Sequence, residues 1–204
     1  MSDPVLIING ATRANGNTDM LVDIIIAGAR DAGVNPVLIA LRNKHISNCI
    51  GCYQCLKTSK CSFQDDMTKI RDLITDAELM VLASPLYWCG VTGLMKTFID
   101  RLFFYYHPQT RSLMSGKRAM ILTPMNQKDV EFESQVLVEF YKRLLRCLNV
   151  EIADMFFFGD IMRKGEVLDR PEYLDQAYRI GISLINYTKG QQGAAPDAQN
   201  SAPR

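Results

Sequence analysis

The segment from Asn9 to Thr18 has the composition of an anion-binding loop. It holds two glycines, three asparagines, two threonines and one arginine, and it ends where a helix is expected to begin. Free backbone N–H groups and the positive end of a helix dipole attract phosphate at such a place. No Walker or Gly-x-Gly-x-x-Gly pattern is present, which disfavours nucleoside triphosphates and the usual dinucleotide mode. A polar turn with an ordinary helix cap is the alternative.

The segment from Ser84 to Gly93 is suited to a flat ring. Tyr87 and Trp88 stand beside a proline and two glycines. Aromatic faces stack on planar ring systems, proline stiffens the backbone, and glycine lets it approach a ligand closely. Burial of these aromatics in a core or a subunit interface is the alternative.

Four cysteines, Cys49, Cys52, Cys55 and Cys61, fall within thirteen residues. In a reducing compartment such a group indicates metal binding or catalysis rather than disulfides. The opening Cys-x2-Cys-x2-Cys is typical of ferredoxin-type iron–sulfur sites, whereas zinc sites more often use two separated pairs. The spacing leaves three alternatives open: an iron–sulfur cluster, a zinc site and a loop without metal.

The elements that must position these residues alternate along the chain. Five short apolar runs predict buried strands, each followed by a segment with helical spacing, and residues 47–64 are expected to be a loop. The strands are expected at 5–8, 37–41, 79–83, 118–122 and 152–158. This order predicts an α/β fold with a parallel sheet and helices on both faces. In the order 2-1-3-4-5, the ligand crevice lies between the first and third strands, where both unusual loops end.

The 204-residue length predicts one domain, residues 1–187, with a flexible tail at 188–204. A net charge of +1 gives no global attraction to nucleic acid or anionic membrane. The sequence shows neither an apolar run of about 18 residues nor a secretory signal pattern, so a cytoplasmic location is expected.

The two loops and the run from Leu94 to Arg101 resemble the NADPH-dependent FMN reductase family over residues 5 to about 160. The resemblance implies a flavodoxin-like three-layer sandwich that binds FMN and uses NAD(P)H. It implies phosphate-binding roles in the first loop for Thr12, Arg13, Asn15, Asn17 and Thr18. It implies ring-binding roles in the third loop for Pro85, Leu86, Tyr87, Trp88 and Gly90, and a facing role after the fourth strand for Thr123 and Pro124. It also implies a homodimer or a dimer of dimers, with FMN at the subunit interface. The cysteine spacing and the following Asp65-Asp66-Met67 resemble the iron–sulfur flavoproteins, which carry a four-iron cluster beside FMN.

Two functions follow as expectations. The first is an FMN oxidoreductase that passes electrons from NAD(P)H to a quinone, a flavin, a metal ion or a protein, with no catalytic acid–base pair required. The second is an iron–sulfur flavoprotein that carries electrons between redox partners. The charge of +1 argues against an ordinary carrier, because such carriers are typically acidic to attract basic partners.

Overall fold

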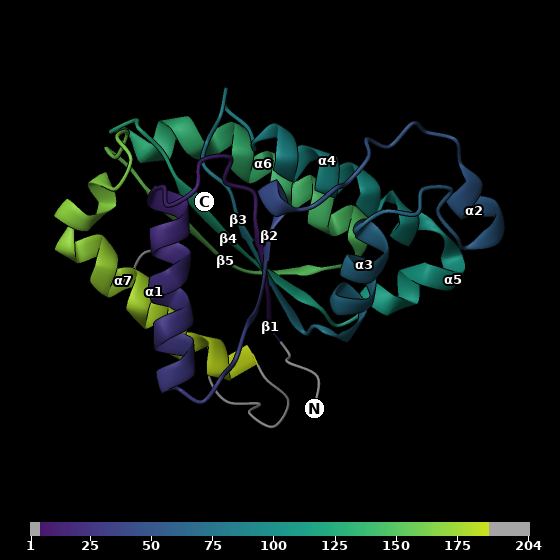
Figure 1. Cartoon of the computed structure of the whole chain (residues 1–204), viewed down its shortest axis with the longest axis horizontal. Coiled ribbons are helices and arrows are strands. Elements are labelled where there is room, and N and C mark those ends of the chain that lie inside the picture. The colour runs from purple at the N-terminus through teal and green to yellow at the C-terminus, as the bar shows by residue number, and fades with distance from the viewer. Residues whose placement is uncertain (1–4, 188–204) are drawn as a thin grey trace.

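The computed structural model describes residues 5–187, so the expected tail at 188–204 lies outside the described residues. Five parallel strands form one sheet in the order β2-β1-β3-β4-β5, which confirms the predicted topology. The strands are β1 (Val5–Asn9), β2 (Val37–Ala40), β3 (Leu79–Ala83), β4 (Arg118–Pro124) and β5 (Glu151–Phe158). Figure 1 shows helices on both sides of this sheet, the three-layer arrangement expected from the sequence.

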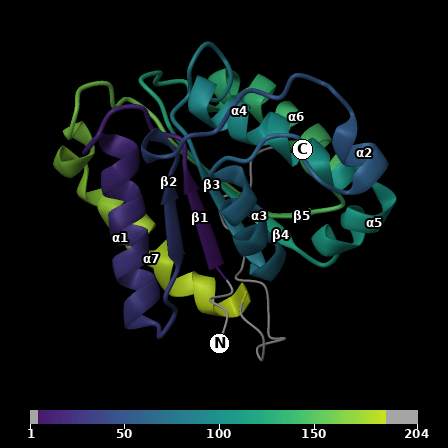
Figure 2. The same ribbon diagram turned by 45° about the vertical axis from the view of Figure 1, so that its right-hand side comes forward.

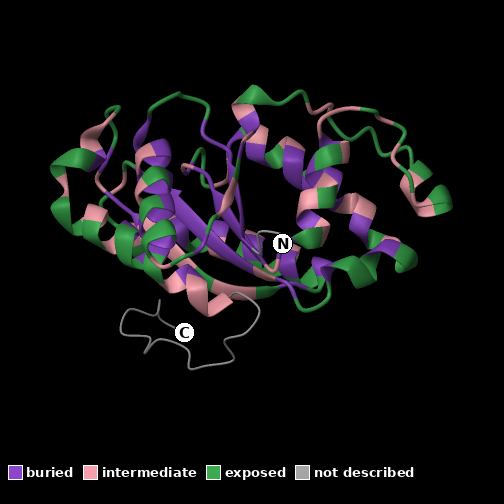
Figure 3. Cartoon of the chain, turned by 60° about the horizontal axis from the view of Figure 1, so that its bottom comes forward, coloured by how far each residue is buried: buried purple, intermediate pink, exposed green. Residues whose placement is uncertain are grey.

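The two faces of the sheet bury separate cores. Along β1, Val5 and Ile7 pack with residues of α1 (Asn17–Asp31) and α7 (Pro171–Ser183). Leu6 and Ile8 point to the other face, because successive side chains of a strand alternate. The helices of that second face are α3 (Met67–Asp76), α4 (Gly93–Arg101) and α6 (Val130–Leu148). Figure 2 shows α1 and α7 together on one side of the sheet, and Figure 3 shows the buried strands between the more exposed helices.

Several local expectations were wrong. The outer strands β2 and β5 are only partly buried, because each has a neighbour on one side alone. The cysteine segment is not all loop, since α2 (Gln54–Thr58) forms within it. Helix α6 begins at Val130, where the Asp129 side chain accepts the N–H of Phe132. Short elements also went unpredicted: α5 (Pro108–Arg111), η1 (Leu41–Asn43), η2 (Leu102–Tyr106), η3 (Ser112–Met114), η4 (Glu166–Asp169) and η5 (Leu184–Tyr187). No described helix is long and apolar enough to cross a membrane.

Candidate functional site

A cleft of about 290 Å³ opens at the carboxyl ends of β1, β3 and β4. This volume is close to the lower end of the range for small-molecule sites, which begins at about 300 Å³. The cleft is bounded by the first loop, the third loop, the turn after β4 and the turn after β5. Its lining residues are Ala11, Thr12, Arg13, Gly16, Asn17, Thr18, Pro85, Leu86, Tyr87, Pro124, Met125, Asn126, Ile161 and Met162. The switch point of the sheet therefore holds the cleft, as the strand order predicts.

The first loop presents an open helix end to this cleft. Gly16 precedes α1, and no side chain caps the helix there. The first N–H groups of a helix have no partner within it, so they are available to an anion. The buried Asp19 side chain fixes the shape of the loop instead. It accepts the Asn15 backbone N–H at 2.7 Å, the Asn9 amide at 2.6 Å and the Arg42 guanidinium at 2.9 Å.

The third loop, residues 84–93 after β3, is a tight turn that contacts the first loop, residues 9–18 after β1. The backbones of Tyr87 and Gly90 pair in both directions, at 2.9 and 3.0 Å. Trp88 and Cys89 between them both have positive φ, 48° and 60°, which is uncommon for residues with a side chain and costs energy. The Tyr87 hydroxyl lies 3.3 Å from that of Thr12. The two loops that sequence reasoning assigned to one crevice are thus in side-chain contact.

Eight of the twelve residues expected to bind the cofactor line the cleft: Thr12, Arg13, Asn17, Thr18, Pro85, Leu86, Tyr87 and Pro124. The other four have different positions. Asn15 is held in the left-handed conformation with its N–H on Asp19, and Gly90 closes the turn. Trp88 is fully exposed, and Thr123 is fully buried. The Thr123 hydroxyl has no hydrogen-bond partner within residues 5–187, which leaves a buried polar atom next to the cleft.

Asn17, which lines the cleft, also contacts the segment after β5. Its amide donates to the Arg163 carbonyl at 2.9 Å, and its carbonyl accepts the Val167 N–H at 3.2 Å. The side chain therefore joins α1 to the segment after β5, and the backbone N–H and the second amide N–H of Asn17 remain as possible donors to a ligand. Sequence reasoning missed two lining residues of that segment, Ile161 and Met162. The signal was available, because this segment also follows the carboxyl end of a strand.

Residues 47–64, which carry the four clustered cysteines and are called the cysteine loop, lie on the α3 and α4 side of the fold. None of these four cysteines lines the cleft. All four thiols are free, with Cys49 and Cys52 exposed and Cys55 and Cys61 half-buried. Burial raises the pKa of the Cys55 thiol, and the neighbouring Cys61, Cys49 and Cys52 add to the rise. Within residues 5–187 no three Cys, His, Asp or Glu side chains are arranged as a metal site. The donor set still fits an iron–sulfur cluster chemically, because four free thiols share one loop.

The loop is anchored by a buried ion pair. Both oxygens of Asp65 accept from the Arg101 guanidinium, at 2.6 and 3.1 Å, and the two side chains are 3% and 1% exposed. Burial alone would raise the pKa of Asp65, but hydrogen bonds from Arg101 and the Ser47 N–H outweigh it and hold the pKa below its ordinary 3.8. The ion pair is therefore strongest in neutral solution.

The depressed pKa of Asp65 predicts acid sensitivity. The unfolded chain takes up this proton at a higher pH than the folded chain, so the pair stabilises fully above the ordinary pKa. Its contribution is lost as pH falls through the lower pKa of the folded state. We expect Asp65→Asn to lower the free energy of unfolding by about 3 kcal/mol at pH 6 and by up to about 1 kcal/mol less than that at pH 3. Urea unfolding of both proteins at the two pH values measures this. A difference that stays the same at both would contradict it.

Comparison with known proteins agrees with this geometry. Residues 4–142 match the family model of NADPH-dependent FMN reductase. The chain belongs to that family. An "Iron-sulfur flavoprotein" of Archaeoglobus fulgidus is 35% identical over 194 residues, which cover 95% of this chain and 84% of that protein. The "Putative NAD(P)H-dependent FMN-containing oxidoreductase YwqN" of Bacillus subtilis is 25% identical, over 86% of this chain and 95% of that one.

Solved structures share the fold. "NAD(P)H:quinone oxidoreductase from Methanothermobacter marburgensis" superposes with a TM-score of 0.69 at 16% identity, over 88% of this chain and 98% of that one. Membership of the FMN reductase family confirms the expected fold, the expected cofactor FMN and the expectation of an oxidoreductase that uses NAD(P)H. The roles of individual residues remain predictions.

Proposed function

We propose that the cleft binds FMN, with the phosphate at the first loop and the ring beside Tyr87 and Pro124. The single observation that carries this proposal is the uncapped start of α1, which opens onto the cleft that Thr12 and Tyr87 share. A dianionic phosphate would supply the missing partner of those N–H groups. Arg13, exposed at the rim with only a 3.4 Å contact to the Met162 carbonyl, would add a charge-assisted hydrogen bond.

When bound, FMN supplies hydride chemistry, taking electrons from NAD(P)H and passing them to an acceptor such as a quinone, a free flavin, a metal ion or a protein. The chain's own residues position the ring. The Leu86 N–H donates to the Pro124 carbonyl at 3.0 Å, which fixes the third loop against the turn after β4. The Thr92 N–H donates to the Ser84 hydroxyl at 3.2 Å and closes the loop from within.

The test is a titration of the dialysed protein with FMN, followed by flavin fluorescence, and then steady-state oxidation of NADH and NADPH. We expect saturable binding and a rate well above that of free FMN. If FMN does not bind, the proposal fails. Binding with a rate equal to that of free FMN would favour the carrier function.

The second candidate function is an electron carrier with an iron–sulfur cluster on Cys49, Cys52, Cys55 and Cys61. Four free thiols on one anchored loop favour it, and so does the similarity to the iron–sulfur flavoprotein of Archaeoglobus fulgidus. Anaerobically purified protein should then contain about four irons and four sulfides per chain, with absorption beyond the flavin bands. Flavin alone in such a preparation would remove this candidate.

We also propose that the protein is a homodimer, because Trp88 is 101% exposed and Tyr87 is 42% exposed beside it. Exposed aromatics at the rim of a site are typical of an interface. Part of the aromatic run from Phe103 to Tyr106 is available as well, since Tyr106 is exposed, whereas Tyr105 is fully buried within the chain.

We expect Trp88→Ala to change the free energy of unfolding of the monomer by less than about 0.5 kcal/mol, because the side chain is fully exposed and packs on nothing in the described part of the chain. The same variant should dissociate at a protein concentration at which the wild type is dimeric. Sedimentation equilibrium of both proteins checks this. Phe132→Ala, at another exposed aromatic on α6, is the matched control and should not dissociate.

A further inference from the structure

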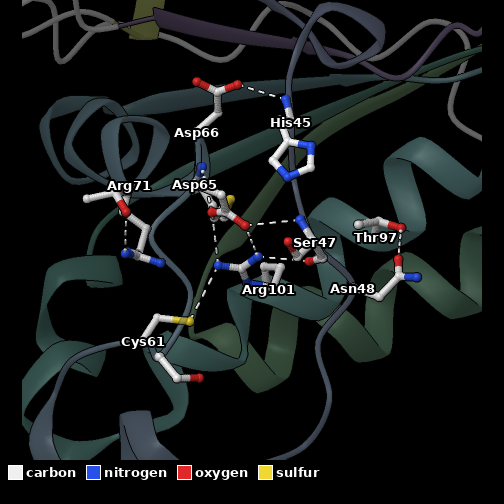
Figure 4. A network of polar contacts seen from close by, with 12 residues as sticks. His45, Ser47, Asn48, Cys61, Asp65, Asp66, Arg71, Thr97 and Arg101 are labelled. Atoms are coloured by element: carbon white, nitrogen blue, oxygen red, sulfur yellow. Dashed lines mark hydrogen bonds and ion pairs between the residues drawn. The ribbon is translucent and has the colours of Figure 1, made fainter.

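Arg101, the last residue of α4, places its charged group under the cysteine loop (Figure 4). Besides the two bonds to Asp65, its guanidinium donates to the Ser47 carbonyl at 2.8 Å and to the Cys61 sulfur at 3.4 Å. It also lies 5.1 Å from the centre of the Phe63 ring. Its Nε is buried without a hydrogen-bond partner in the described part of the chain, so one donor remains unused beside the loop.

These contacts join the two ends of the cysteine loop. Ser47 precedes the first cysteine of the quartet, whereas Cys61 is its last and Asp65 follows it. One turn earlier on α4, Thr97 donates to the Asn48 side chain at 2.8 Å. Closing a loop at its base lowers its conformational entropy, so the ends of the segment that carries the four thiols are held together.

The other end of α4 is fixed to the flavin side of the fold. The Thr92 hydroxyl caps the helix by accepting the Met95 N–H at 3.2 Å, and it donates to the Gly10 carbonyl of the first loop at 2.7 Å. A Cβ added at Gly10 would come within 2.8 Å of the Met95 side chain. Helix α4, about 13 Å long by its nine residues, thus connects the cleft to the cysteine loop.

We propose that Arg101 is a positioning residue that closes the cysteine loop and sets a positive charge against the Cys61 sulfur at a fixed place relative to the cleft. The part that concerns a bound cluster rests on the second candidate function above, and the closure itself does not. A buried ion pair is weak evidence for stability, because apolar residues of similar volume often serve as well. A guanidinium suits this position because its planar fork reaches a carboxylate, a carbonyl and a sulfur at once.

The first arm of the test needs no cluster. Metal-free protein is treated with iodoacetamide, and the modification of each cysteine is followed by peptide mass spectrometry, with the exposed Cys147 on α6 as internal reference. The reaction is run at about pH 10, above the ordinary thiol pKa of about 8.5, so that the loss of charge does not decide how much thiolate is present. Under this condition we expect Arg101→Gln to raise the ratio of the Cys61 rate to the Cys147 rate about tenfold, because the loop opens locally. Arg101→Lys keeps the charge but not the fork, so it should raise the ratio less.

Arg111→Gln is the matched control, since this guanidinium lies over the Tyr106 ring instead, and its ratio should stay at the wild-type value. If Arg101→Gln does not fold, Arg101→Lys carries this arm. An unchanged Cys61 ratio in a folded Arg101 variant overturns the proposal, whatever the metal content.

The second arm uses protein reconstituted anaerobically with ferrous iron and sulfide. A donor and a positive charge beside a ligand sulfur favour the reduced, more negative cluster. We expect Arg101→Gln to shift the reduction equilibrium about tenfold toward the oxidised form, about 59 mV lower for one electron, and Arg101→Lys to restore most of the shift. A purely structural role would not give this rescue.

The alkylation experiment and the reduction potential test the loop closure and the cluster function separately. If the wild type assembles no cluster while the Cys61 ratio rises in the Arg101 variants, the closure stands and the cluster function falls. If the cluster assembles and its potential is the same in the wild type and Arg101→Gln, the proposed charge effect on Cys61 is overturned.

Discussion

Replacing Gly181 with alanine is expected to lower the free energy of unfolding by about 3 kcal/mol, the upper end of the usual cost of overpacking. Gly181 on α7 faces α1 across a very close helix crossing. A Cβ at Gly181 would overlap the Ile25 carbonyl oxygen and come within 2.9 Å of the Ala29 nitrogen. These are backbone atoms, so no side-chain rotation relieves the overlap. The two helices must separate, or α7 must shift.

Chemical denaturation of the two proteins measures this effect, and a thermal scan should show a fall of roughly 6–12 °C for a domain of this size. Gly93→Ala is the matched control, because its Cβ would meet nothing within 4 Å. The control should be neutral or slightly stabilising, since alanine is a better helix residue than glycine. A stability of Gly181→Ala within 0.5 kcal/mol of the wild type would show that α1 and α7 do not cross so closely.

This close crossing was not predictable from the sequence, although the helices were. The apolar positions of α1 and α7 repeat at helical spacing, which is a local property. The close approach of Gly28 and Gly181, by contrast, depends on two segments that lie more than 150 residues apart in the sequence. A glycine within a helix weakens it, and that cost was the one available hint that something packs there.

The positions of the strands along the chain could be predicted because each strand is a short apolar run ended by Gly, Pro or a polar pair, and their order is that of a known doubly wound sheet. The outer strands were predicted less well. β2 carries Leu38 at 39% exposure, and an apolar run by itself does not reveal whether a strand has one neighbour or two. The helix α2 was missed because five residues at Gln54–Thr58 show no periodicity of their own.

The candidate site was predicted where a loop has an unusual composition, and was missed where it does not. Thr12, Arg13 and Tyr87 stand in segments dense in Gly, Asn, Pro or aromatic residues. Ile161 and Met162 have ordinary side chains, and only the position of β5 brings them to the cleft. Likewise, Arg101 reads as a common helix residue with a positive charge in the last turn. Its burial beneath the cysteine loop depends on tertiary structure.

A charge reversal at Arg13 is expected to weaken FMN binding about 100-fold, equivalent to about 2.7 kcal/mol. A hydrogen bond from a charged group contributes about 1.5–3 kcal/mol, and Arg13→Glu also adds repulsion against a dianion. The fold should be unaffected, because within residues 5–187 the exposed Arg13 side chain makes only the 3.4 Å contact to the Met162 carbonyl. Fluorescence titration with FMN gives the dissociation constant of each protein.

Riboflavin is the matched ligand, because it carries the same ring without the phosphate. Its affinity should differ less than about threefold between the wild type and Arg13→Glu. Arg30→Glu reverses a charge at the other end of α1, and at that distance salt screens most of its effect on the cleft. If Arg13→Glu weakens FMN and riboflavin equally, Arg13 acts on the ring or on the shape of the loop, and the phosphate must bind elsewhere. If neither affinity changes, the open end of α1 holds the phosphate with backbone N–H groups alone.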